Sequence, residues 1–170
     1  MRNAFVAAFA VCALFATGAL AQSKTAVGTW KMDTAQSDFG SELAPKSVTV
    51  TVLKDTPEML SWRVYMIDDK GKSMSYSWKG PKDGSMHPVM QNGKEIGKQS
   101  AQEEGEGGIH RHGEDADGST FDAHEKILED GKTMNEQITS KSKDGKESNS
   151  KSVYHRVNGM KKTAEKNPGL

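Results

Sequence analysis

The sequence predicts an all-β protein that folds as a single antiparallel up-and-down β-barrel of eight to ten strands. Apolar and polar residues alternate in short runs, and Gly, Asp and Asn separate these runs. Alternation is typical of strands because successive side chains point to opposite faces of a sheet. No stretch after residue 21 repeats its apolar residues at the helical interval. Evenly spaced strands favour a closed meander over a Greek-key sandwich, and closure removes exposed sheet edges.

The first 21 residues have the three parts of a secretory signal peptide, which we expect to be cleaved after Ala21. Arg2 supplies the basic start, residues 4–16 are apolar, and Ala19-Leu20-Ala21 has the small residues of a cleavage site. The apolar run is shorter than the roughly 20 residues of a spanning helix, which makes a retained anchor the weaker alternative. We therefore expect a periplasmic or secreted protein without membrane contact after cleavage. Cys12, the single cysteine, leaves with the signal, so the mature chain has no disulfide or thiolate.

The mature chain is predicted to contain one domain, residues 22–157, followed by a disordered polar tail at 158–170. Ten segments of the domain have strand character. In order, they are residues 27–33, 47–54, 59–68, 72–79, 86–91, 95–102, 108–113, 120–128, 133–141 and 147–157. The tightest hairpin turns are expected at Asn92-Gly93 and Asp130-Gly131, because these residues accept positive φ angles. Residues 34–39 are expected to form a short helical turn after the first strand.

The distribution of apolar and charged residues limits the core and the class of partner. Of the 41 apolar residues in the mature chain, 25 lie in residues 22–90. The first half can therefore build a core, whereas the strands of the second half have sparse apolar faces. Lys and Arg nearly balance Asp and Glu, so charge does not indicate a nucleic acid or an anionic membrane as partner. No sequence feature sets the oligomeric state.

Two predicted strands show which side chains share a face. Met74, Tyr76 and Trp78 lie on one side of their strand, and serines lie on the other. The strand at 59–68 is apolar on both sides, so we expect both of its faces to be covered. The aromatic rings, together with Trp30, either line a ligand pocket or pack as an ordinary core, and the pattern leaves both interpretations open.

Short motifs carry a resemblance to lipocalin and calycin barrels. Val27-Gly28-Thr29-Trp30-Lys31 resembles the Gly-x-Trp motif of their first strand. In these barrels the tryptophan closes the floor and packs against an arginine of the last strand, so the resemblance implies that Arg156 is the partner of Trp30. Ala44-Pro45-Lys46-Ser47 and Glu129-Asp130-Gly131-Lys132-Thr133 extend the likeness to small exported bacterial proteins that are lipocalin-like. The resemblance implies a barrel and no established activity. Residues 99–125 depart from it, because they are more acidic and richer in Gly and His.

Three histidines form a candidate metal site. His110 and His112 are two residues apart and share a face of their strand, and His124 lies on the following strand. Three imidazoles, with Glu114 on the same side, are suitable ligands for Zn²⁺, Ni²⁺ or Cu²⁺. The alternative is that these histidines are solvated surface side chains.

No residue pattern indicates catalysis. The serines do not lie in a Gly-x-Ser-x-Gly nucleophile motif. Asp115-Ala116-Asp117-Gly118 lacks the later glutamate of a calcium loop, and Gly105-Glu106-Gly107-Gly108 precedes no helix that could hold a phosphate. We therefore expect a protein that is not an enzyme and needs no cofactor.

The combined patterns favour binding of a small, partly apolar molecule inside the barrel. Met74, Tyr76 and Trp78 would form its wall, and Trp30 and Arg156 would close the floor. Two alternatives belong to other classes. One is periplasmic metal binding through the three histidines, and the other is a protein-interaction module that uses its sheet surface and has no cavity.

Overall fold

The computed structural model describes residues 25–157. The predicted signal peptide, with Cys12, and the predicted tail at 158–170 lie outside the described residues. Ten strands follow one another along the chain, and each overlaps one segment predicted from the sequence. They are β1 (Gly28–Met32), β2 (Ser47–Thr56), β3 (Met59–Ile67), β4 (Ser73–Gly80), β5 (His87–Gln91), β6 (Lys94–Glu103), β7 (Gly108–Asp115), β8 (Thr120–Ile127), β9 (Thr133–Lys141) and β10 (Glu147–Val157).

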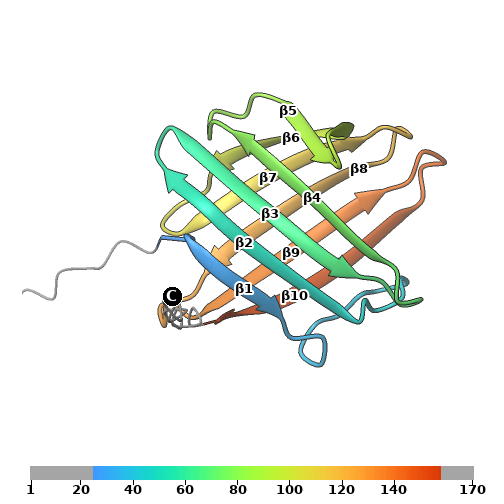
Figure 1. Ribbon diagram of the computed structural model, residues 1–170, viewed down its shortest axis with the longest axis horizontal. Coiled ribbons are helices and arrows are strands. Elements are labelled where there is room, and N and C mark those ends of the chain that lie inside the picture. The colour runs from blue at the N-terminus through green and yellow to red at the C-terminus, as the bar shows by residue number, and fades with distance from the viewer. Residues whose placement is uncertain (1–24, 158–170) are drawn as a thin grey trace, which may run out of the picture.

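The strands form one closed antiparallel barrel in sequence order (Figure 1). Each strand pairs with its neighbours in the chain, and β1 also pairs with β10, which closes the sheet. The predicted up-and-down barrel is confirmed, with ten strands. Closure includes residues 99–125, where the sequence departs from its resemblance, because β6, β7 and β8 pair over most of their lengths.

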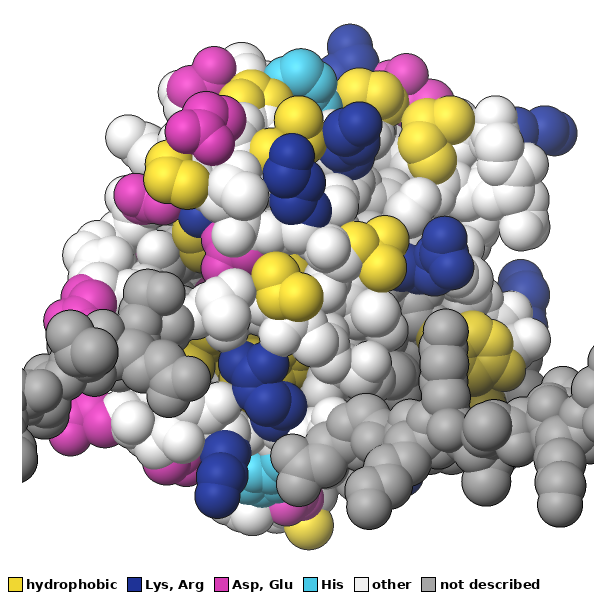
Figure 2. All heavy atoms as spheres, turned by 60° about the vertical axis from the view of Figure 1, so that its left-hand side comes forward, with side chains coloured by type: hydrophobic (Ala, Val, Ile, Leu, Met, Phe, Trp, Pro, Cys, Tyr) yellow, Lys and Arg dark blue, Asp and Glu magenta, His cyan; other side chains and the backbone are white. Residues whose placement is uncertain are grey.

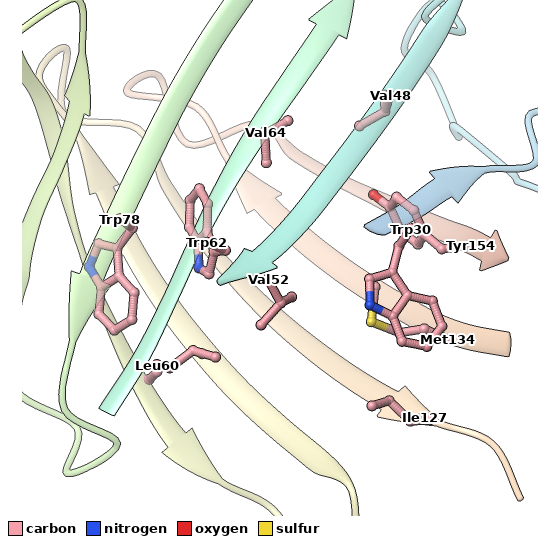
Figure 3. Close-up of a cluster of buried hydrophobic side chains, with 11 residues drawn as sticks. Trp30, Val48, Val52, Leu60, Trp62, Val64, Trp78, Ile127, Met134 and Tyr154 are labelled. Carbon is pink, nitrogen blue, oxygen red and sulfur yellow. The ribbon is translucent and has the colours of Figure 1, made fainter. Parts of the chain in front are cut away.

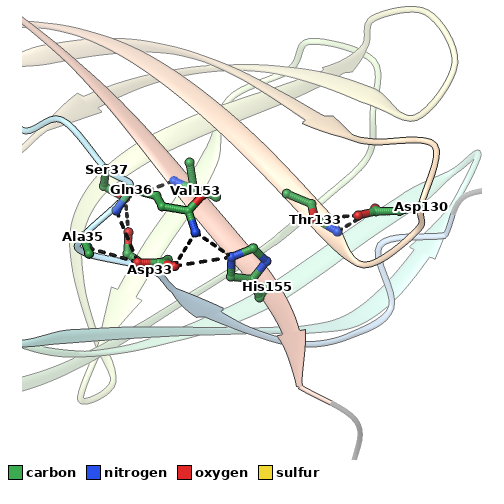
Figure 4. A network of polar contacts seen from close by, with 8 residues as sticks. All are labelled: Asp33, Ala35, Gln36, Ser37, Asp130, Thr133, Val153 and His155. Carbon is green, nitrogen blue, oxygen red and sulfur yellow. Dashed lines mark hydrogen bonds and ion pairs between the residues drawn. The ribbon is translucent and has the colours of Figure 1, made fainter.

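Residues 34–39 do not form the helical turn expected from the sequence. The chain makes one turn, in which Gln36 N donates to Asp33 O at 3.3 Å, and Asp38 then bridges Lys151 of β10. The Asp33 carboxylate holds this turn, since it accepts from Gln36 N at 3.2 Å and from Gln36 Nε2 at 2.7 Å (Figure 4). These contacts resemble those of a helix N-cap, but no helix follows, because Asp38 exchanges two backbone hydrogen bonds with Lys151 of β10, at 2.8 and 2.7 Å, and so continues as extended chain. Among residues 25–157, no helix is long and apolar enough to span a membrane.

Of the two turns expected to be tightest, Asn92-Gly93 is a two-residue hairpin turn, whereas Asp130-Gly131 lies in a five-residue connection; a two-residue turn also occurs at residues 57–58, where Thr56 pairs with Met59. Asn92 and Gly93 join β5 to β6 with φ angles of 50° and 78°, which is the left-handed region that a two-residue hairpin turn requires. In the turn from β8 to β9, the Asp130 carboxylate accepts from Thr133 N at 2.9 Å and from Thr133 Oγ1 at 2.7 Å (Figure 4). Both turns therefore follow from local residue chemistry.

Trp30 and Arg156 close one end of the barrel, which we call the floor. Trp30 is fully buried, and the Arg156 guanidinium carbon lies 4.1 Å from its ring centroid. The guanidinium also donates to Val27 O at 2.6 Å and to Gly131 O at 2.9 Å, so it fastens β10 to the chain before β1 and to the β8–β9 turn. A Cβ atom on Gly28 would lie 2.7 Å from Arg156 Nη1, and φ is 142° there. Glycine is therefore required before this tryptophan, and the implied Trp30–Arg156 contact is confirmed.

The apolar core lies inside the barrel and is formed mainly by the first four strands (Figure 3). Trp62 of β3 and Trp78 of β4 stack with ring centroids 6.3 Å apart, and Tyr76 meets Trp62 edge-on at 5.9 Å. On the floor side, Met134 and Ile127 pack into the same cluster as Trp30. The later strands contribute fewer apolar side chains, as their composition predicts.

We call the opposite end of the barrel, on the right in Figure 1, the mouth. It is formed where β3 ends and β4 and β10 begin. Alternating positions place Met66, Met74, Ile138 and Ser150 on the inner side at this end, and all four are half-buried.

Figure 2, in which the left-hand side of Figure 1 comes forward, shows acidic, basic and hydrophobic side chains interspersed on the outer surface.

The floor generates the first prediction. We expect Trp30→Ala to lower the free energy of unfolding by about 3–5 kcal/mol, because it removes a buried aromatic ring and leaves a cavity. That is a large part of the total stability of a small domain. Tyr65→Ala removes a ring that is 48% exposed, so it is the matched control and should cost far less. Urea unfolding followed by circular dichroism measures both. Equal midpoints for the two variants would contradict the role of Trp30.

Candidate functional site

An arginine lies inside the barrel at mid-height. Arg111 is at the centre of β7, paired with Ala101 of β6 and Ala123 of β8. Both alanines are fully buried, and their small side chains leave room for the long arginine. The Arg111 side chain is only 12% exposed. It points inward because Ile109 and Arg111 share the face opposite to His110 and His112.

Two carboxylates share the charge of Arg111. Glu125 of β8 and Glu136 of β9 are directly opposite each other in the strand pairing. Arg111 Nη2 contacts Glu125 Oε1 at 2.6 Å and also forms an ion pair with Glu136 Oε1. Arg111 Nη1 donates to Gln99 Oε1 at 3.2 Å, and Tyr154 OH donates to Glu136 Oε2 at 3.1 Å. We call Gln99, Arg111, Glu125, Glu136 and Tyr154 the Arg111 cluster.

Burial and ion pairing change the protonation of the cluster. Burial raises the pKa of Glu125 to about 7; the Arg111 charge opposes this shift and the neighbouring Glu136 adds to it. The pKa of Arg111 is raised, since the two carboxylates outweigh the effect of its burial. Burial, followed by Glu136, also holds the pKa of Tyr154 well above its usual value. The interior therefore has one fixed positive charge beside two carboxyl groups, and burial favours the protonated form of Glu125.

Within the described part of the chain, three buried N–H donors around the cluster have no hydrogen-bond partner. They are Trp62 Nε1, Gln99 Nε2 and Arg111 Nε. The Arg111 guanidinium carbon lies 5.8 Å from the Trp62 ring centroid and 5.9 Å from that of Phe121, so arginine and rings form one layer. An unpaired buried donor costs about 1–3 kcal/mol. Three such donors around one arginine therefore need an explanation.

The five residues predicted to contact a ligand fall into three groups. Trp30 and Arg156 form the floor. Trp78 is 2% exposed and its Nε1 donates to Gln99 O at 2.9 Å, so it packs in the core. Met74 and Tyr76 line the inner wall and are half-buried, as expected of residues that a ligand could reach from the mouth. Their contact with a ligand stays a prediction.

Sequence reasoning missed the Arg111 cluster, although the alternation contains the signal. Arg111 shares the inner face with Ile109, Glu125 lies between Ala123 and Ile127 in the same alternation, and Glu136 lies between Met134 and Ile138. A charged residue flanked on its own face by apolar residues should be buried and paired. That rule would have identified the three charged members.

The predicted histidines lie on the outer face of the barrel. His110 stacks on His124 with ring centroids 4.7 Å apart, and His124 Nδ1 contacts Glu104 Oε2 at 2.8 Å. His110 Nε2 and His112 Nδ1 instead converge on Asp122 Oδ1, at 3.2 and 3.1 Å. The strand pairing causes this arrangement, because it places His112 opposite Asp122 and His110 opposite His124. Within residues 25–157, no group of three or more His, Cys, Asp or Glu side chains is placed to hold a metal ion.

The pKa of Glu125 generates the second prediction. In the unfolded chain this group titrates near 4.5, and in the folded protein near 7. Between these values the folded state binds more protons than the unfolded state, so this group makes stability fall as pH rises. Glu125→Gln keeps a hydrogen-bond acceptor for Arg111 and should remove a loss on the order of 1–3 kcal/mol between pH 5 and pH 7.5.

Urea unfolding at several pH values measures this difference. All other titratable groups are unchanged in the variant, so their contributions cancel. The exposed Glu129→Gln is the matched control and should keep the wild-type slope. A Glu125→Gln protein with the same pH slope as the wild type would show that Glu125 is ionised throughout.

Comparison with known proteins identifies the fold. No family model and no curated protein matches the chain. Among solved structures, a variant of the fluorescent protein UnaG with asparagine replaced by alanine has a TM-score of 0.51 at 14% identity, covering 78% of this chain and 96% of UnaG. A second UnaG variant, with glutamine at that position, has a TM-score of 0.50 at 14% identity, covering 77% and 95%. Zebrafish ileal bile acid-binding protein, complexed with cholic acid, has a TM-score of 0.49 at 10% identity, covering 77% and 98%. The likeness to UnaG shows the fold alone, a closed lipocalin-like barrel.

Proposed function

We propose that this protein is an exported, non-enzymatic barrel that binds a small, partly apolar molecule in its interior. The observation that carries the proposal is the set of three unpartnered donors on Trp62, Gln99 and Arg111. They face one layer of the interior, and an acceptor on a bound molecule would satisfy them. Protein binding sites commonly combine an apolar lining with a few placed polar groups of this kind.

The mouth supplies the route to that layer. Met66, Met74 and Ile138 are half-buried on the inner side between the mouth and Arg111. Unbranched methionine side chains adapt to ligands of different shape. Trp30 and Arg156 cover the floor at β1 and β10, and we therefore place the entry of the ligand at the opposite end. Apolar parts of the molecule would contact the methionines, and its polar group would reach the donors.

The state of the acids favours binding over catalysis. Both Glu125 and Glu136 are engaged by Arg111, and Glu136 also accepts from Tyr154. An acid that catalyses proton transfer must face the substrate proton within hydrogen-bond reach. Here both carboxylates are engaged within the chain, where they hold the arginine in position.

The proposal predicts saturable binding of a neutral apolar probe. N-phenyl-1-naphthylamine should gain fluorescence with one site per chain, because the interior excludes water around it. Ser150 lies on the inner side near the mouth and is half-buried, so Ser150→Phe should obstruct access and weaken binding about tenfold or more, which is 1.4 kcal/mol. Asn149→Phe places the same ring on the outer side of β10 and should leave binding unchanged. Probe binding unaffected by Ser150→Phe would exclude the interior as the site.

Metal binding on the outer face is a second candidate, and the convergence of two imidazoles on Asp122 favours it. His110 Nε2 and His112 Nδ1 both lie about 3 Å from one carboxylate oxygen. After small side-chain movements, a metal ion could bind between these three atoms in place of the two hydrogen bonds. Burial opposes ionisation of Asp122, but hydrogen bonds from His112 and His110 outweigh it and lower its pKa. The ligand set would be His110, His112 and Asp122, with His124 behind His110.

Titration calorimetry with Zn²⁺ at neutral pH tests this candidate. We expect a dissociation constant below about 100 μM, equivalent to about −5.5 kcal/mol, and loss of the signal in His112→Ala. His155→Ala is the control, because His155 pairs with Asp33 elsewhere on the surface. Weaker binding in the wild type, or equal binding in both variants, would leave these histidines as surface side chains.

A further inference from the structure

We infer that the ligand of the barrel interior is uncharged and presents a carbonyl or similar acceptor, and that the interior excludes carboxylates. This inference rests on the proposed function and names the chemical class of its ligand. It follows from how the charge of Arg111 is used. A buried arginine ordinarily suggests an anion site, because its planar donor group matches a carboxylate. Here two carboxylates of the chain already occupy it.

The charges of the cluster leave no free cation for an anionic ligand. Arg111 Nη2 pairs with both Glu125 and Glu136, and Nη1 donates to Gln99. Glu136 is 6% exposed and Glu125 is 22% exposed, so water screens these charges little. A ligand carboxylate at this layer would approach two like charges and one neutralised arginine, and it would lose its hydration without an ion-pair partner.

Two further basic side chains that are not fully exposed, Lys82 and Arg156, also have partners in the chain. Lys82 is 6% exposed and contacts Asp55 at 2.6 Å and Glu103 at 3.0 Å. The Arg156 guanidinium donates to Val27 O and Gly131 O beneath the floor tryptophan. Neither group is available to a ligand that enters from the mouth.

The remaining polar capacity of the site consists of donors. Arg111 Nε, Trp62 Nε1 and Gln99 Nε2 each have an N–H group to donate and no acceptor among residues 25–157. A carbonyl oxygen accepts two hydrogen bonds without bringing a charge. An ammonium group would be attracted by the carboxylates, but it has only donors and would leave all three N–H groups unpaired. An uncharged acceptor is therefore the group that fits.

Three ligands with the same apolar chain and different head groups test the inference. Decanamide, decanoate and decylamine compete with N-phenyl-1-naphthylamine for the wild-type protein at pH 8, where the acid and the amine are charged. We expect decanamide to displace the probe with an affinity about tenfold or more above that of decanoate and of decylamine. The wild-type comparison needs no variant, so it remains decisive if a cluster variant fails to fold.

Each of the other outcomes overturns either the inference alone or the inference together with the proposed function. Decanoate bound as tightly as decanamide, or decylamine bound more tightly, would overturn the inference and leave the proposed function standing. Probe binding that none of the three ligands reverses would also overturn it, since the interior would then not accept a neutral carbonyl. Absence of probe binding itself would overturn the proposed function and the inference together.

Variants of the two acids provide a second, independent test. Glu136→Gln and Glu125→Gln each remove one negative charge beside Arg111 and keep an acceptor for it. Each should improve decanoate binding about tenfold or more and change decanamide binding by about twofold or less. Glu129→Gln, in the exposed β8–β9 turn, is the matched control and should change neither. Unchanged decanoate binding in both folded cluster variants would show that these acids do not set the preference.

Discussion

Arg111 can remain charged inside the barrel because Glu125 and Glu136 stand beside it on the next two strands. Removing a charge from water costs several kcal/mol, and partners with good geometry are needed to offset that cost. The strand pairing supplies them, since it places the two glutamates opposite each other and within reach of one guanidinium nitrogen. The interior of the later strands is therefore a polar network rather than an apolar core. This explains why residues 91–157 form strands with so few apolar side chains.

The two halves of the chain contribute different kinds of side chain to the same interior. Strands β1 to β4 supply Trp30, Trp62 and most of the apolar core, whereas β6 to β9 supply the charged groups and the small alanines around them. Arg111 joins the halves because its guanidinium reaches from the glutamates to the Trp62 ring. A cation against an aromatic ring contributes roughly 0.5–2 kcal/mol. The interior is consequently amphipathic from one wall to the other, which suits a molecule that is itself partly apolar.

The fold could be predicted from the sequence because it depends on local patterns. Alternation located every strand, and Asn92-Gly93 and Asp130-Gly131 located two hairpins, since both signals act over a few residues. The site was harder because it depends on which strands become neighbours and in which register. His110 and His112 were correctly placed on one face, yet their shared partner is Asp122, which only the pairing of β7 with β8 shows. The same two-residue alternation places Arg111 on the inner face, between two histidines that point outward.

The bond from Arg156 to Val27 spans 129 positions of the chain, which affects how the barrel is made. Synthesis proceeds at about 5–20 residues per second, so β1 emerges roughly 6–26 s before its partner β10. During this interval the strands already made would form an open sheet in which β1 is an unpaired edge strand. Such edges attract other chains. The pairing of β1 with β10 can therefore form only after the last strand has been made, and until then the edge of β1 is open to pairing with other chains.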